Sequence, residues 1–138
     1  MKALHIEKDL EVLCFEASSF PEGIKPAFEK LREALDVGDT RTYIGISKPD
    51  KYGIMHYKAA VLILETDEKK NNGLELFTIQ KGIYLTETIK DWEVNEKEIT
   101  KTFQQLLLHP YLDPQSYCIE WYDGKDLCCM VKNLTDDL

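Results

Sequence analysis

Apolar residues along the chain follow two spacings, and each spacing predicts a different kind of element. Over 26–35 and 95–107 they recur three or four positions apart, which places them on one face of a helix. Elsewhere they alternate with polar residues, or run together in short stretches rich in branched and aromatic side chains, as in β-strands. Strands are therefore expected at 3–17, 42–47, 55–65, 74–79, 83–89, 117–122 and 127–131.

The predicted elements occur in the order strand, helix, strand, strand, and this order is repeated. Phe28 of the first helix lies about 75 positions before Phe103 of the second. A repeat at this distance indicates a duplicated β-α-β-β unit, with halves at about 3–66 and 74–134 of a single domain over 1–138. The expected fold class is α+β, an antiparallel sheet with two helices on one face and a concave cleft between the halves.

The start of each predicted helix carries a residue suited to that position. Pro26 stands in the first turn, where the N–H that proline lacks would have no partner. Asn95 is placed as an N-cap, and Glu98 three positions later completes a capping-box arrangement.

The stretch Tyr117–Tyr122 carries a carboxylate in the middle of a predicted strand. Because strand side chains alternate between faces, Glu120 shares one face with Tyr122 and Cys118, whereas Trp121 points the other way and is expected to pack under a helix. A dry, unpaired carboxylate would cost several kcal/mol. Glu120 therefore either lies on a solvated strand face or lines a pocket framed by aromatic rings, which would suit an amphipathic or cationic ligand.

Charge and composition narrow the classes of partner. The chain has 17 Lys and Arg against 25 Asp and Glu, a net charge of −8, which disfavours direct nucleic-acid binding. No signal peptide is visible, and the longest apolar run, Ala59–Leu64, is too short to span a bilayer. A cytoplasmic protein without a membrane partner is the expectation.

The sulfur and imidazole groups do not form a metal-binding or catalytic pattern. The four cysteines lie in strand-like stretches with no C-x-x-C pair, so reduced, buried thiols are expected. His5, His56 and His109 are isolated and are expected to be surface or loop residues. No nucleophile elbow, phosphate-binding loop or dinucleotide motif is present, so no metal, cofactor or catalytic residue is predicted.

Four segments, in chain order, resemble those of the GyrI-like small-molecule-binding domain, also called the bacterial transcription activator effector-binding domain. The resemblance covers nearly the whole chain. Two features depart from the family pattern: 106–109 reads Leu-Leu-Leu-His where a Trp-Leu pair is common, and the second hairpin is short. The matching segments are the entry to the first helix, the first hairpin, a G-x-Y strand and a closing E-x-Y strand, at 20–31, 43–64, 77–84 and 119–122.

The resemblance implies a ligand cleft between two such units and, in multidrug-sensing members, a carboxylate among aromatic rings that receives lipophilic cations. Glu120 and Tyr122 match the family's E-x-Y pair, and Tyr84 matches its G-x-Y tyrosine. The other aromatic candidates for ligand binding are Trp92 at the expected rim of the cleft, Tyr43 and Tyr57, although such rings are more often core or strand-pair residues than ligand cages.

The predicted function is a stand-alone small-molecule-binding module, with no helix-turn-helix segment, that resembles the sensor domain of multidrug-type transcription regulators. Its expected ligand is a lipophilic or cationic effector. Two alternatives stay open at this point. One is a protein-binding module that uses the concave face, as gyrase-inhibiting relatives do. The other is a hydrolase of a reactive small molecule, in which Glu120 with Tyr122 or Tyr84 orients a water.

Overall fold

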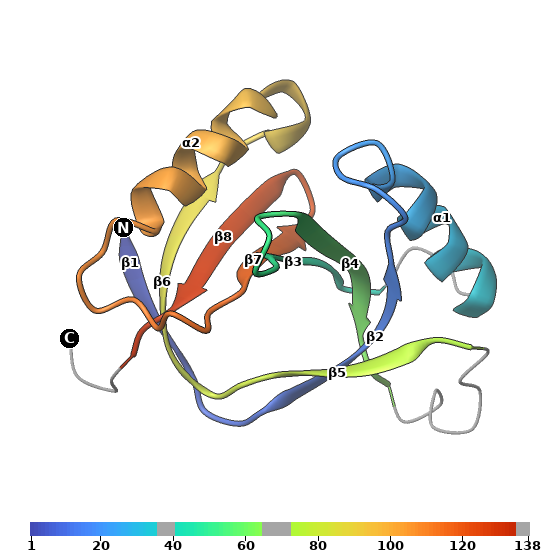
Figure 1. Ribbon diagram of the computed structural model, residues 1–138, viewed down its shortest axis with the longest axis horizontal. Helices are drawn as coiled ribbons and strands as arrows, with labels where there is room; N and C mark the ends of the chain where they lie inside the picture. Colours follow the sequence, from blue (N-terminus) through green and yellow to red (C-terminus); the bar gives the residue numbers. More distant parts are fainter. Residues whose placement is uncertain (36–40, 65–72, 135–138) are drawn as a thin grey trace. The chain divides into compact units, whose positions relative to one another are not determined.

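Two compact units, each with antiparallel strands and a helix packed on them, make up the computed structural model (Figure 1). The first unit comprises Leu10–Ile79, and the second joins Met1–Asp9 to Gln80–Leu138. The predicted α+β class is confirmed, and the strand pairs within each unit are antiparallel. The residues that the structure describes are 1–35, 41–64 and 73–134.

The described part of the first unit contains one helix and four strands, which pair in the order β5-β2-β4-β3. Strand β4 lies between β2 and β3, and its residues Tyr57, Ala59, Ala60 and Val61 are buried. The face toward α1 is buried from Tyr57 to Val61, whereas on the other face Ala60 is buried but His56 is exposed, so the cover on both faces that its almost continuous apolar sequence predicts is only partial. Residue 65 of the predicted stretch lies outside the described residues. The elements are α1 (Ile24–Leu35), β2 (Leu10–Glu16), β3 (Tyr43–Pro49), β4 (Met55–Leu62) and β5 (Glu75–Ile79).

The apolar stripe of α1 faces the sheet of its own unit. Ala27, Phe28 and Leu31 are buried, and the helix contacts β4 and β2. Full burial of a side chain such as Leu31 contributes about 1.5–3 kcal/mol, so this stripe, more than helix propensity, keeps the short helix in place. Pro26 lies in the first turn, as predicted.

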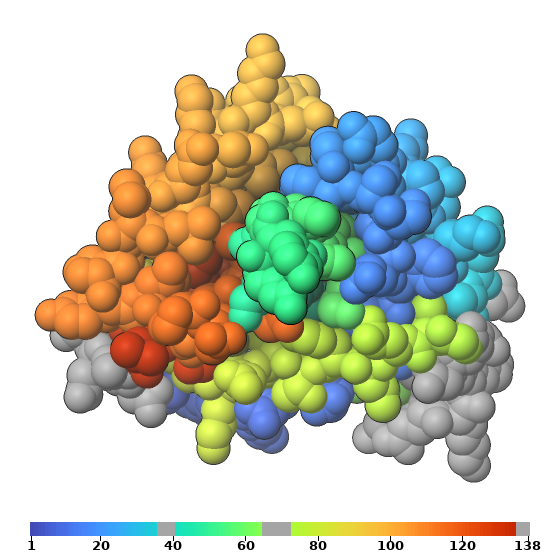
Figure 2. All heavy atoms as spheres, in the orientation of Figure 1, coloured from blue at the N-terminus to red at the C-terminus, as the bar shows by residue number. Residues whose placement is uncertain are grey.

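The described part of the second unit has the same plan, with strand order β1-β6-β8-β7 and helix α2 packed on β6 and β8. The outer side of α2 and the segment after it, yellow to orange in Figure 2, project from the surface, and Leu108 is 82% exposed. The elements are β1 (Lys2–Ile6), β6 (Gly82–Ile89), the 3-10 turn η2 (Trp92–Val94), α2 (Lys97–Leu106), β7 (Cys118–Asp123) and β8 (Asp126–Lys132).

The repeated β-α-β-β order is confirmed: β2-α1-β3-β4 in the first unit corresponds to β6-α2-β7-β8 in the second. Each unit also has one additional strand in the same place of its sheet. Strand β5 pairs with β2, and β1 pairs with β6. Strand β1 precedes the β-α-β-β set of the first unit but pairs with the first strand of the second set, and β5 precedes the second set but pairs with the first strand of the first set. The chain therefore passes between the units more than once.

One prediction about the start of the chain was wrong. The stretch 3–17 forms two strands, β1 and β2, that belong to different units. Three consecutive charged residues, Glu7, Lys8 and Asp9, separate them, and the Asp9 carboxylate accepts a hydrogen bond from the backbone N–H of Lys81 at 2.8 Å. Apolar periodicity reports that a stretch can be a strand, but it carries no information on which strand it pairs with.

Two local predictions in the second unit were also wrong. Helix α2 begins at Lys97 with Glu96 as its N-cap and no side-chain cap, and Asn95 instead bonds to the carbonyls before it. Trp121 does not lie under a helix, because it alternates with Tyr122, which packs in the core beneath α2. Asn95 was correctly predicted to lie next to the start of the helix and Trp121 to lie in a strand, but the direction of each side chain depends on tertiary contacts.

Gly23 gives a test of the packing at the entry to α1. A Cβ at this position would lie 2.5 Å from the backbone O and 2.7 Å from the backbone N of Ser19, so the turn over 19–23 would have to open. We expect Gly23→Ala to lower the free energy of unfolding by about 1–3 kcal/mol, the usual cost of overpacking. Urea denaturation followed by circular dichroism measures this. The exposed neighbour Glu22→Ala is the control and should change stability by less than about 0.5 kcal/mol; equal effects would contradict the steric explanation.

Candidate functional site

Register between β7 and β8 determines which side chains share the face that carries α2. Glu120 pairs with Cys129, and Tyr122 with Leu127. Directly opposed residues of an antiparallel pair point to the same side. Cys129 and Leu127 belong to the core cluster that includes Leu106 of α2. Glu120 and Tyr122 therefore lie on the helix-bearing face of the second unit.

A hydrogen bond joins the two residues of the E-x-Y strand. The Tyr122 hydroxyl donates to Oε1 of Glu120 at 2.9 Å, and both side chains are half-buried. A hydrogen bond to a charged acceptor is stronger than a neutral one. It fixes the phenol ring beside the carboxylate, and Glu120 stays partly accessible.

An indole ring lies against the phenol. Trp92 in η2 and Tyr122 have ring centroids 5.1 Å apart at an interplanar angle of 66°, an edge-to-face arrangement. Trp92 is half-buried and packs on the same core cluster as Tyr122. The structure thus brings together Glu120, Tyr122 and Trp92, three of the residues that the sequence predicted for ligand binding.

Two thiols lie on the same face as the carboxylate. Burial, and secondly the Glu120 carboxylate, raises the pKa of Cys118 to about 11. Burial and then Glu120 also raise the pKa of Cys129, which is directly opposite Glu120. Both groups are neutral near pH 7, and all four cysteines of the chain are free, as predicted. These two neighbours of Glu120 are therefore neutral and polarisable, which suits an apolar ligand.

Sequence reasoning did not identify Cys129 as a neighbour of Glu120, although the information was present. The turn between β7 and β8 contains only Gly124 and Lys125, and Gly124 has φ 60°, a conformation that glycine adopts without strain. Counting outward from a two-residue turn pairs Asp123 with Asp126 and, three steps later, Glu120 with Cys129.

Tyr84 lies on the opposite face of this sheet from Glu120. It pairs with Lys132, whereas its neighbour Leu85, in the core beneath α2, pairs with Val131. Its hydroxyl donates to the carbonyl of Gln80 at 2.6 Å, and it is 2% exposed. Burial, followed by the nearby aspartates, raises its pKa to about 12. The structure gives this tyrosine a packing role within the second unit.

Tyr43 and Tyr57 belong to the first unit and pack there with α1. The Phe28 ring lies 6.1 Å from that of Tyr43 and 6.3 Å from that of Tyr57, in both cases edge to face. The Arg32 guanidinium lies 4.9 Å from the centroid of Tyr43. Tyr57 is 1% exposed and is a core residue. These rings form an aromatic cluster of their own beneath α1.

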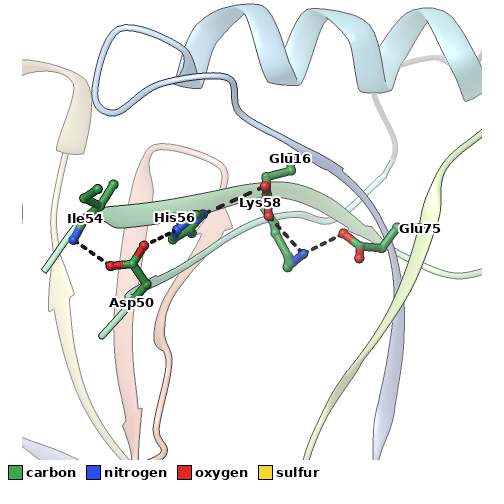
Figure 3. A network of polar contacts seen from close by, with 6 residues as sticks. All are labelled: Glu16, Asp50, Ile54, His56, Lys58 and Glu75. Atoms are coloured by element: carbon green, nitrogen blue, oxygen red, sulfur yellow. Dashed lines mark hydrogen bonds and ion pairs between the residues drawn. The ribbon is translucent and has the colours of Figure 1, made fainter. Parts of the chain in front are cut away.

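A second group of polar side chains, which the sequence did not predict, crosses the strands of the first unit on the side away from α1 (Figure 3). His56 and Lys58 of β4 alternate with Tyr57, so both point to this side. His56 Nε2 lies 2.9 Å from Asp50 Oδ2, and Lys58 Nζ lies 2.6 Å from Glu75 and 3.4 Å from Glu16. The signal in the sequence was the two-residue spacing of His56 and Lys58, but their acidic partners come from the turn after β3 and from strands β2 and β5.

The contacts of this network connect the ends of strands, which is a structural role and not that of a reaction centre. Asp50 Oδ1 also accepts the backbone N–H groups of Tyr52 and Ile54, which closes the turn between β3 and β4. Lys58 covers the Phe77 ring at 5.9 Å from its centroid. Exposed ion pairs of this kind contribute little individually, so the shared turn and strand contacts matter more than the charges.

Asp50 predicts a pH dependence of stability. The hydrogen bond from His56 is the main cause that lowers the pKa of Asp50 below its ordinary value of 3.8. A carboxyl with a lowered pKa in the folded state stabilises it above the unfolded pKa, and this contribution is lost as pH falls through the folded pKa. Between pH 5 and pH 2.5, we therefore expect the free energy of unfolding to fall less steeply for Asp50→Asn than for the wild type.

Urea titrations at a series of pH values measure this slope. The exposed Glu29→Gln on α1 removes the same charge without this hydrogen bond and should keep the wild-type slope. Parallel curves for wild type and Asp50→Asn would show that the contact with His56 does not persist in solution.

Other features of the described residues do not provide a competing site. No group of three or more His, Cys, Asp or Glu within them is placed to hold a metal ion. A polar hollow in the second unit, at the ends of β1, β6 and β8, is lined in part by Lys81 and Lys132, but Lys132 Nζ already lies 3.7 Å from Asp113. Within the same residues, no helix is long and apolar enough to cross a membrane.

Comparison with known proteins finds solved structures that have a similar fold. No family model matches the chain, and no curated protein matches it. The structure of SAV2435 bound to tetraphenylphosphonium aligns with a TM-score of 0.65 at 13% identity, over 96% of this chain and 94% of that one. The integron cassette protein VCH_CASS2 of Vibrio cholerae aligns at 0.62 and 12% identity, with the same coverage.

A third similar structure is a hydrolase from Listeria innocua. It aligns with a TM-score of 0.51 at 7% identity, over 96% of this chain and 90% of that one. At these identities the three likenesses show a shared fold, which extends over nearly the whole chain in each case.

Proposed function

We propose that the chain is a GyrI-like effector-binding module whose site at Glu120 takes lipophilic cations. The observation that carries the proposal is the half-buried Glu120 carboxylate, held by the Tyr122 hydroxyl at 2.9 Å, with Trp92 against the same phenol. The similar structure of SAV2435 is described as bound to tetraphenylphosphonium, a lipophilic aromatic cation. Chemistry and fold therefore favour the same class of ligand.

The physical basis is the combination of one carboxylate with aromatic rings and two neutral thiols in the same unit. A partly desolvated carboxylate attracts a cation more strongly than an exposed one does. The two aromatic rings add apolar area, and a cation over a ring face contributes about 0.5–2 kcal/mol. Small inorganic cations would lose their hydration in this place without gaining such contacts, so a large organic cation is the better ligand.

A substitution that removes the charge of Glu120 tests the proposal. Glu120→Gln keeps an oxygen that accepts the Tyr122 hydroxyl but removes the charge. We expect calorimetric titration with tetraphenylphosphonium to show an affinity about 5- to 150-fold lower in this variant, the equivalent of about 1–3 kcal/mol for a lost charge-assisted contact. The affinity for triphenylphosphine oxide, a neutral aromatic probe, should stay the same.

Glu29→Gln is the matched control, because it changes the net charge equally at an exposed position of α1. It should bind tetraphenylphosphonium like the wild type. Equal affinities of wild type and Glu120→Gln for this cation, or no binding by the wild type, would contradict the proposal. A melting temperature close to that of the wild type shows that the substitution acts on binding and not on folding.

Hydrolysis of a reactive small molecule is a second candidate, which the Tyr122–Glu120 hydrogen bond supports. A carboxylate and a phenol within hydrogen-bonding distance can orient a water and share its protons. The similar structure from Listeria innocua is described as a hydrolase. Under this hypothesis Tyr122→Phe abolishes turnover of an epoxide or ester panel, whereas under the binding proposal no member of the panel is turned over by the wild type.

A further inference from the structure

The short connection between β6 and α2 is closed by hydrogen bonds to Asn95. The Asn95 side-chain amide donates to the carbonyl of Lys90 at 2.9 Å and to that of Asp91 at 3.1 Å. Its backbone N–H donates to the carbonyl of Trp92 at 3.0 Å, and that of Val94 donates to Asp91 at 3.1 Å. Trp92 is thus enclosed in a turn whose ends are tied together by one side chain.

Asp91 adopts an uncommon backbone conformation in this turn. Its φ of 48° and ψ of 55° lie in the left-handed region, and it is the only residue other than glycine with positive φ among those that the structure describes. Such a conformation is unfavourable for a side chain with a Cβ and persists where the surrounding contacts enforce it. It reverses the chain immediately before Trp92 and so sets the direction of the indole.

Three contacts join this turn to the β7–β8 hairpin. The backbone N–H of Trp92 donates to the carbonyl of Lys125 at 3.0 Å. Lys90 Nζ lies 2.8 Å from Asp126 Oδ2, and the Asp126 carboxylate also accepts the backbone N–H of Asp91. The same hairpin carries Tyr122 and Glu120 on β7. The turn and the strand with the carboxylate are therefore one connected structure, and Trp92 is held where its ring meets that of Tyr122.

We infer that Asp91 and Asn95 are positioning residues that hold the Trp92 indole as a fixed aromatic wall against Tyr122, the residue bonded to Glu120, and that this wall selects aromatic cations over alkyl cations of the same charge. The inference rests on the proposed function. A ring that is already ordered loses little freedom when a ligand ring packs on it, so a fixed wall favours partners whose flat faces match it. A flexible alkyl chain gains less from such order, since it can adapt to many wall positions.

A first experiment tests the fixed wall without any ligand. The chain has two tryptophans, so Trp121→Phe leaves Trp92 as the sole indole reporter. In this background we expect Asn95→Ala to raise the acrylamide quenching constant of Trp92 at least about twofold and to lower its fluorescence anisotropy. Gln104→Ala, an exposed amide on α2, is the matched control and should leave both unchanged. Unchanged quenching in a folded Asn95→Ala variant would overturn the positioning role.

A second experiment tests selectivity as the ratio of dissociation constants for tetrabutylphosphonium and tetraphenylphosphonium. We expect the wild type to prefer the aromatic cation, and Asn95→Ala to reduce the ratio about fivefold, within the range of a lost ring contact. Asp91→Gly should reduce it as well without lowering the melting temperature, because glycine adopts positive φ freely. If the role of Asp91 is purely structural, the substitution should instead lower the ratio and the melting temperature together. Trp92→Leu should bring the ratio close to one.

The outcomes separate the two proposals. If tetraphenylphosphonium binds in a Glu120-dependent manner but all variants keep the wild-type ratio, the selecting wall is wrong and the binding function stands. If the wild type binds neither cation, the binding function fails and the selectivity fails with it. A stable Asp91→Gly with an unchanged ratio would overturn the positioning role of Asp91.

Discussion

The packing of α2 on one face of its sheet is the constraint on which the candidate site depends. The helix buries Leu106 against Leu127 and Cys129 of β8, and this burial determines which face of the sheet is covered. Register with β8 then places Glu120 and Tyr122 on that same face and not on the opposite one. A slip of one residue in the β7–β8 pairing would move Glu120 and Tyr122 to the other face of the sheet, away from Trp92. The alternate side chains of β7 would then lie beneath α2.

The site combines groups whose roles in folding and in binding overlap. Tyr122 and Trp92 pack on the core beneath α2, and the Tyr122 hydroxyl also bonds to Glu120, the half-buried carboxylate in the interior of β7. The neighbouring thiols keep their protons because burial and the carboxylate both oppose the thiolate. The site thus combines a carboxylate with aromatic rings and two neutral thiols.

The first unit has the same β-α-β-β order, but its strand β3, which corresponds to β7, has no carboxylate on the face of the sheet that carries the helix. In its sheet Ser47, Gly45 and Tyr43 of β3 pair with Tyr57, Ala59 and Val61, so the positions of β3 on the face with α1 carry no carboxylate. A network of ionic groups lies instead on the side away from α1, where it joins the turn after Asp50 and the strand ends at Glu16 and Glu75. The two units therefore share a plan while their charged residues differ in position and use.

The sequence by itself determined the α+β class, the repeated β-α-β-β order and the alternation that pairs Glu120 with Tyr122, because each follows from spacing within one element. Tertiary structure decided the rest. The separation of 3–17 into strands of two units and the partners of Lys58, which are Glu16 and Glu75, depend on contacts between separate elements. The face taken by Trp121 depends on the side of the sheet on which α2 packs. Asn95 is the clearest case: its position next to α2 was visible in the sequence, but whether its amide caps the helix or ties the turn before it depends on the path that Asp91 gives the backbone.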